Sequence, residues 1–475
     1  MAVFYRPKNA FVGDVIPFFD GGLFKPFYLK IWRDYHGPER VDGWHMLTTA
    51  DHLHYQEHPT RIVGGTGSVL KIVDVYHMFY FKFDYDSQPE KQMVCHATSS
   101  DLKKWAELPE ETFMADGKIY ELSDWRDPFV FWNDEDQQFW MILAAQKRGK
   151  TMRKGCVGKC VSKDLKTWTY AEPLYAPAIH QSAHECPDLF KMGDWYYLIY
   201  SAYTDRFQTY YRMSKSLQGP WLTPERDTFD TRAFYAAKTG TDGVNRFIYG
   251  WNPTREFNMW KFNPQVSQGK DYNTWDWGGS MIVHRLIQNP DGTLSVTVPE
   301  TVEQAISVAR TVAIEPLNGA WELADGAARV DSPYAYASAL LPMIPDECRL
   351  EAEVCFEGSP RQFGIALQVD EAFDLGYYLC FEPYRNRIQF KTGLRMVEEG
   401  GKMFPYEVEM ERPIALKPGV DYAVKIFVQE TILEVYINAE IALSARMFNY
   451  TGRRFGLFVS EGEAHFKNIK LFTIY

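Results

Sequence analysis

Short runs of apolar and aromatic residues, separated by polar turns, dominate the chain and predict β-strands. Residues 129–132 and 139–145 predict a hairpin with its turn at 133–136, and residues 195–202 predict the return strand of a second hairpin. A third hairpin is predicted from residues 15–19 and 23–29, with the turn between them. Helical periodicity is scarce, so the predicted fold class is all-β.

A loose internal repeat indicates how the strands are grouped. Residues 98–105 (TSSDLKKW) return as 161–168 (VSKDLKTW), and weaker copies lie at 49–55 and 213–221. The interval of roughly 50 to 60 residues is the length of one four-stranded propeller blade. The copies span about residues 10–290, which is enough for five blades.

The pattern changes after the turn at residues 289–292. Alternation becomes cleaner, for example at 349–354 and 422–428, and short strands with regular turns are typical of a β-sandwich. We therefore predict a five-bladed β-propeller in residues 1–300, a connector in 301–315 and a β-sandwich in 316–475. The sandwich is expected to have a structural or accessory sugar-contacting role.

Composition narrows the class of function. The 475 residues carry a formal net charge of −11, which argues against a nucleic acid partner and against an anionic membrane surface. There is no apolar run of 18 residues and no apolar signal-peptide core at the start. Seven scattered cysteines fit a reducing compartment, so a cytoplasmic location is expected. The oligomeric state is left open.

Each of the three hairpins is preceded by an acidic residue: Asp14, Asp127 or Glu185. If the hairpins are equivalent units, the three carboxylates occupy equivalent positions and can converge on one site. A simpler interpretation of Arg126 beside Asp127 is a salt bridge at the end of a strand, which contributes little to stability.

The segments around these acids resemble the three acidic motifs of glycoside hydrolase family 32, which includes invertases, inulinases, levanases and fructosyltransferases. Trp125-Arg126-Asp127-Pro128 and Glu185-Cys186-Pro187-Asp188 contain the family's Arg-Asp-Pro and Glu-Cys motifs letter for letter. The first motif keeps Asp14, but Gly13 replaces the usual asparagine and Leu29 stands where the family has a glutamine. The polar lining of the pocket therefore differs from that of a typical invertase.

The resemblance implies that Asp14 is the nucleophile, Glu185 the acid/base and Asp127 a stabiliser of the transition state. It implies a retaining β-fructofuranosidase acting on sucrose or short fructo-oligosaccharides, with fructosyl transfer at high sucrose. Repulsion among the three carboxylates is expected to raise the pKa of Glu185, and Arg126 is expected to keep Asp127 ionised. The residues expected to contact substrate are Arg126, Trp44, Thr66, His184 and Trp277.

Further expectations concern metals, cofactors and acceptors. No cofactor and no metal are expected, because the metal-like spacing of His52, His54, Glu57 and His58 falls on a polar blade turn. Trp125 and Trp277 are expected to stack an acceptor sugar, and Cys186 is expected to be a small buried neighbour that positions Glu185.

Other functions stay open. Within the family, the chain could be a fructosyltransferase or a fructan-specific hydrolase. A more distant alternative is an inverting arabinofuranosidase or xylosidase type of five-bladed propeller, although the spelling of the Arg-Asp-Pro and Glu-Cys motifs argues against it. A non-catalytic sugar-binding propeller is disfavoured by the presence of all three acids.

Overall fold

The computed structural model describes residues 2–32, 35–86, 91–254, 277–392, 410–450 and 452–474. Contacts divide the chain into two compact units, Met1–Asn252 with Gly278–Leu294, and Pro253–Trp277 with Ser295–Tyr475. Strands make up nearly all of the regular structure in the described residues, which confirms the all-β prediction. Within the described ranges the helical elements are η1 (Pro109–Glu111), α1 (Glu300–Ala305) and η2 (Pro383–Arg385). None of the helices in the described segments is long and apolar enough to cross a membrane.

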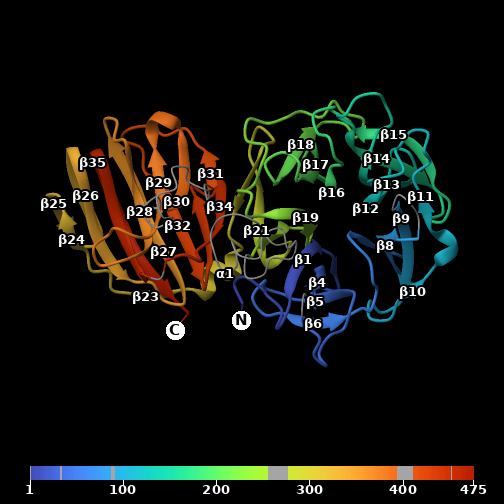
Figure 1. Ribbon diagram of the computed structural model, residues 1–475, viewed down its shortest axis with the longest axis horizontal. Helices are drawn as coiled ribbons and strands as arrows, with labels where there is room; N and C mark the ends of the chain where they lie inside the picture. The colour runs from blue at the N-terminus through green and yellow to red at the C-terminus, as the bar shows by residue number, and fades with distance from the viewer. Residues whose placement is uncertain are drawn as a thin grey trace. The chain divides into compact units, whose positions relative to one another are not determined.

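The first unit is a five-bladed propeller, as predicted, and its sheets stand in a ring in Figure 1. Its strands are β1 (Phe11–Ile16), β2 (Phe19–Asp20), β3 (Leu23–Phe24), β4 (Phe27–Ile31), β5 (Trp44–Thr48), β6 (Gln56–Pro59), β7 (Gly67–Ile72), β8 (Val75–Asp84), β9 (Lys91–Ser99), β10 (Ala106–Glu107), β11 (Phe113–Met114), β12 (Arg126–Asn133), β13 (Gln138–Gln146), β14 (Gly155–Ser162), β15 (Thr169–Tyr175), β16 (Glu185–Met192), β17 (Trp195–Ala202), β18 (Gln208–Ser214), β19 (Tyr235–Thr241), β20 (Arg246–Pro253), β21 (Gly279–Gln288) and β22 (Leu294–Thr297).

The innermost strands β1, β7, β12, β16 and β19 neighbour one another in turn. Hydrogen bonds link successive blades: Ser68 Oγ accepts from Val130 N at 3.0 Å, and Asp188 Oδ2 accepts from Thr239 N at 2.6 Å. The ring closes through antiparallel pairing of β1 with β21, where Val12 faces Gly279. The sequence also predicts that residues 275–280, followed by 281–286, close the last blade, and of these residues 275 and 276 lie outside the described ones.

Apolar side chains from neighbouring blades pack face to face and hold the ring together. One cluster joins the second and third blades through Phe79, Trp125 and Met141. Another joins the third and fourth blades through Trp140, Leu198 and similar residues. The aromatic richness of the sequence is therefore used in large part to fill the spaces between sheets.

The predicted turn repeat is a recurring local structure. Ser99 Oγ accepts from Leu102 N at 2.9 Å, and Ser162 Oγ accepts from Leu165 N at 3.0 Å. The leucine has positive φ in both copies, 63° and 65°. The serine and aspartate side chains satisfy the turn's backbone donors, which is why the motif recurs in the sequence.

The predicted hairpins of the third and fourth blades are present as β12–β13 and β16–β17. The prediction that each acid precedes its strand was wrong, because Asp14 lies inside β1, Asp127 is the second residue of β12 and Glu185 begins β16. The boundaries of the first blade also differ from the prediction. Strand β1 ends at Ile16 and pairs with β4, while β2 and β3 form a separate two-residue pair. Pro17 and Pro26 explain the breaks, because proline cannot donate to a strand ladder.

The second unit contains the predicted C-terminal sandwich. Its strands are β23 (Val308–Arg310), β24 (Glu315–Asn318), β25 (Trp321–Ala324), β26 (Ala327–Met343), β27 (Glu347–Glu357), β28 (Gln362–Val369), β29 (Tyr377–Glu382), β30 (Arg387–Thr392), β31 (Met410–Pro413), β32 (Tyr422–Gln429), β33 (Ile432–Ile437), β34 (Ile441–Arg446) and β35 (Arg454–Thr473). The long strand β35 pairs with β26, β27 and β28, so it is the central element of this unit. The domain boundaries at 300 and 315 stay predictions.

Candidate active site

The three predicted acids lie on three inner strands, each at a β-bulge. The bulges are register shifts between Val12 and Val15, between Arg126 and Phe129, and between Glu185 and Asp188. Counting from the last paired residue before each bulge, Glu185 is first, Asp127 second and Asp14 third. The sequence led us to expect the three acids at equivalent positions of their strands. Instead, they occupy successive positions of the bulge. Bulges redirect side chains next to functional sites, and here they bring three carboxylates together.

Asp14 is held by hydrogen bond donors on both oxygens. Trp251 Nε1 donates to Oδ1 at 2.9 Å, and the Thr66 hydroxyl donates to Oδ2. The Cys186 thiol lies 3.7 Å from Oδ2. Burial raises the pKa of Asp14, and the donors from Thr66 and Trp251 oppose that rise. The carboxylate is thus fixed as an acceptor, as a nucleophile requires.

Asp127 is the most enclosed of the three acids, with 3% of its surface exposed. Cys186 N donates to its Oδ2 at 2.9 Å, and the Cys186 sulfur lies 3.7 Å from the same oxygen. Both residues have positive φ, 57° for Asp127 and 49° for Cys186. Burial raises the pKa of Asp127, and the Arg126 charge opposes the rise. Such strained backbone is typical of functional sites.

Glu185 receives a donor on each oxygen. Arg126 Nη2 donates to Oε1 at 2.9 Å and the Tyr235 hydroxyl donates to Oε2 at 2.6 Å. Burial raises the pKa of Glu185, as predicted for an acid/base, although desolvation is a larger cause than repulsion from Asp127. Arg126 lies 3.9 Å from Asp127 through Nε, so its short ion pairs are with Asp124 and Glu185 and not with the partner that the sequence indicated.

Tyr235 and Trp251 are contacts that sequence reasoning missed. Tyr235 begins β19 and Trp251 is its cross-strand partner in the fifth blade, which carries no acidic motif. Arg126, Glu185 and Tyr235 all occupy the last paired position before the bulge in three successive blades. Aligning the blades by their hairpins would have singled out Tyr235 as the neighbour of Glu185.

The other predicted contact residues are placed as follows. Thr66 binds the Asp14 carboxylate. Trp44 in β5 and His184 before β16 have no exposed surface, and His184 Nε2 lies 2.9 Å from His180 Nδ1. Trp277 is partly buried and groups with the second unit. Their contacts with substrate stay predictions.

Two expectations about individual side chains need separate mention. Trp125 is fully buried in the cluster between the second and third blades, so it is not placed to stack an acceptor sugar. His52 and His54 bind protein groups, since His52 Nε2 lies 2.7 Å from the Tyr249 hydroxyl and His54 Nδ1 lies 2.7 Å from Asp51 Oδ2.

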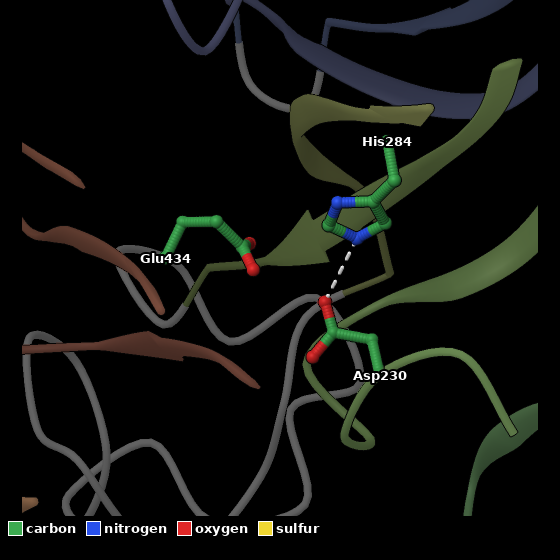
Figure 2. Close-up of side chains that lie close together, drawn as sticks. All are labelled: Asp230, His284 and Glu434. Carbon is green, nitrogen blue, oxygen red and sulfur yellow. Dashed lines mark hydrogen bonds and ion pairs between the residues drawn. The ribbon is translucent and has the colours of Figure 1, made fainter. Parts of the chain in front are cut away.

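A buried hydrogen bond between a histidine and an aspartate supports the segment that leads into β19. His284 Nε2 in β21 points at Asp230 Oδ2 at 3.0 Å, and neither side chain is exposed (Figure 2). Asp230 also accepts from Thr231 N at 2.6 Å, and the His284 ring packs against Phe234 with centroids 4.6 Å apart. This pair therefore anchors the residues immediately before Tyr235.

Three carboxylates in one buried cluster of a propeller, with donors arranged around each, define a glycoside hydrolase. The family is given by two matching models: "Glycosyl hydrolases family 32 N-terminal domain" at residues 6–294 and "Glycosyl hydrolases family 32 C terminal" at residues 335–473. The chain belongs to glycoside hydrolase family 32.

Known relatives agree with this family. Sucrose-6-phosphate hydrolase of Escherichia coli is 23% identical over 459 residues, covering 89% of this chain and 84% of that protein. The exo-inulinase of Aspergillus awamori has a similar structure, with a TM-score of 0.72, 15% identity and coverage of 100% of this chain and 98% of that one. Sucrose-6-phosphate hydrolase of Lactobacillus gasseri has a TM-score of 0.67, 16% identity and coverage of 100% and 93%. These structural similarities support the fold.

Proposed function

We propose that this protein is a retaining β-fructofuranosidase that hydrolyses terminal β-fructosyl bonds of sucrose or short fructo-oligosaccharides. The observation that carries the proposal is the bulge-built cluster of Asp14, Asp127 and Glu185. Asp14 and Asp127 share the thiol of Cys186, and Glu185 is bridged to the Asp127 strand by Arg126. A family 32 propeller with all three motifs carries every group that the reaction needs.

In the first step, an Asp14 carboxylate oxygen forms a bond to the anomeric carbon of the fructosyl group. The bond from that carbon to the leaving oxygen breaks, and Glu185 gives its proton to this oxygen. Burial favours the protonated form of Glu185 before the step. Asp127 binds sugar hydroxyls and stabilises the positive charge that develops on the ring.

In the second step, Glu185 is a carboxylate and accepts a proton from water. The water oxygen forms a bond to the anomeric carbon, and the bond to Asp14 breaks, so the free carboxylate returns. Two displacements retain the anomeric configuration. A sugar hydroxyl held in place of this water gives transfer products, because positioning competes effectively with concentrated water.

A second candidate substrate is sucrose-6-phosphate. The relative from Escherichia coli, 84% of whose length is covered by this chain, is named as a hydrolase of this compound. Both substrates present the same fructosyl bond, so the three acids serve either one equally. The difference between them lies in the leaving sugar.

The roles of the acids are tested by Asp14→Asn and Glu185→Gln, with NMR detection of the first anomer released from sucrose. We expect β-fructofuranose first, abolished activity in Asp14→Asn, and a loss of about 10²- to 10⁴-fold in Glu185→Gln that is smaller for activated fructosides. Glu135→Gln, in the turn at the far end of β12, is the matched control. Initial release of the α-anomer, or near-normal rates in Asp14→Asn, would contradict the proposal.

Excess free glucose over fructose at molar sucrose would reveal the transfer reaction.

A further inference from the structure

A hollow of about 560 Å³ opens next to the start of β16, the strand that begins with Glu185. This volume is in the range of small-molecule sites. Its lining combines exposed apolar side chains with polar ones: Met152, Arg153, Ile179, His180, Gln181, Thr204 and Asp205. Met152 and Ile179 are 69% and 52% exposed, so both side chains present apolar surface to the hollow.

Three loops form the walls of this hollow: the β13–β14 loop, the loop that ends at Glu185, and the loop after β17. Glu185 pairs with Ser201 of β17, and the loop after β17 carries Thr204. The Ser182 and Thr204 hydroxyls are 3.0 Å apart, which ties this loop to the one before β16. Gly155 N donates to His180 O at 3.1 Å, which ties in the β13–β14 loop. Because Glu185 protonates the leaving oxygen, a hollow beside it is on the leaving-group side of the bond.

The polar groups of the hollow are positioned by buried partners. Fully buried His184 contacts the ring of His180 at 2.9 Å, and His180 Nε2 lies 3.7 Å from Asp205 Oδ2. Asp205 also accepts from the Tyr210 hydroxyl at 2.6 Å. Burial lowers the pKa of both histidines, so their rings are neutral at neutral pH and can accept as well as donate.

The charges in the hollow balance. Arg153 contributes one positive charge, Asp205 contributes one negative charge, and no carboxylate among the described residues lies within 4.0 Å of the Arg153 guanidinium. A phosphate would gain from Arg153 and be repelled by Asp205. A neutral sugar can use both, since Asp205 accepts from hydroxyls and Arg153 and Gln181 donate to them, while Met152 and Ile179 cover its apolar face.

We propose that this hollow binds the leaving group of the substrate, that this group is an unphosphorylated sugar, and that His180, Gln181 and Asp205 set the preference for it. The proposal rests on the proposed function and extends it to the identity of the leaving group. His184 is a positioning residue, because it acts through His180.

The test compares three substrates: sucrose, sucrose-6-phosphate and methyl β-fructofuranoside, which has no leaving sugar. We expect the native protein to have a higher kcat/KM for sucrose than for sucrose-6-phosphate. Asp205→Asn and Gln181→Ala should each lower kcat/KM for sucrose by about 10-fold, the order expected for a lost hydrogen bond to a hydroxyl, and leave methyl β-fructofuranoside within about twofold. Lys163→Gln, at the opposite end of β14 from Arg153, is the control for a changed surface residue.

Three outcomes would overturn the proposal. If both variants lower the rates for sucrose and the methyl fructoside equally, their effect runs through Glu185 and not through the leaving group. If sucrose-6-phosphate is preferred, the leaving group is phosphorylated. Glucose binding can be measured by saturation-transfer NMR without any reaction. Binding should weaken about 10-fold in Asp205→Asn, and an unchanged signal would contradict the proposal that the hollow binds the leaving sugar. A native protein that binds glucose but cleaves no fructoside would refute the proposed function alone.

Discussion

At the scale of the residue, the environment of Glu185 is set by two neighbours in equivalent positions on adjacent blades, Arg126 and Tyr235. Each donates to a different oxygen of the carboxylate, at 2.9 and 2.6 Å. Donors to the ionised form lower a pKa, while burial raises it. The protonation of Glu185, the proposed acid/base, is therefore a balance that the adjacent blades control.

Replacement of Tyr235 by Phe should shift this balance in a known direction. Loss of the donor raises the pKa of Glu185, so the protonated form persists to higher pH. The alkaline limb of the kcat/KM profile for sucrose should therefore shift to higher pH. The pH profile of Tyr235→Phe against the native protein measures this. Tyr120→Phe removes a buried hydroxyl that donates to Ala171 O in the third blade and should leave the profile in place. A shift of the alkaline limb to lower pH would refute the account.

At the scale of the element, the inner strands of the propeller depend on the segments that deliver them. The Asp230–His284 pair fixes the residues before β19, and β19 supplies the Tyr235 hydroxyl. Loss of a buried hydrogen bond to a charged group typically costs about 1.5 to 3 kcal/mol.

We expect Asp230→Asn to lower the free energy of unfolding by an amount of that order. Urea unfolding followed by tryptophan fluorescence measures it. Asp242→Asn, in the exposed turn between β19 and β20, is the matched control and should change stability by less. A loss below about 0.5 kcal/mol, the usual range of surface substitutions, would show that the pair does not anchor this segment.

The elements also show what the sequence could and could not predict. The hairpins of the third and fourth blades followed from their aromatic runs, and the turn repeat followed from its Ser-x-Asp-Leu spelling. The bulges did not, because the extra residue in each strand is defined only by pairing with the next one. Asp14 was consequently expected before a strand and at the same position as the other acids, although it lies inside β1. Trp251 was missed because its contact spans 237 positions of the chain.

At the scale of the whole molecule, several buried histidines make stability depend on pH. Burial lowers the pKa of His52 and of His96 to about 4 from an ordinary value of 6.5. At these histidines the unfolded chain therefore binds more protons than the folded one between about pH 4 and 6.5. Their contribution to stability is complete above pH 6.5 and falls as the pH decreases through this window, by up to about 1.4 kcal/mol per pH unit for each histidine, while the buried carboxyls with raised pKa, such as Glu185, oppose this fall.

Urea midpoints at pH 7.0, 5.5 and 4.5, chosen to span this window, should decrease in that order. His52→Gln should flatten the dependence, since one of the groups that takes up a proton on unfolding is gone. The acids with lowered pKa, such as Asp20 at about 2, protonate mainly below this range and leave its upper part to the histidines. A midpoint that is constant from pH 7.0 to 4.5 would contradict the prediction.

The pairing of β1 with β21 affects when the propeller can close during synthesis of the chain. Val12 and Gly279 are neighbours in the ring, but a ribosome making about 5 to 20 residues per second produces them roughly a quarter of a minute to a minute apart. Asp14 is thus made well before Trp251, its hydrogen bond donor. A nascent chain holds Asp14, the proposed nucleophile, in an unfinished ring, and translation that stops before β21 leaves the fold open at the strand that carries it.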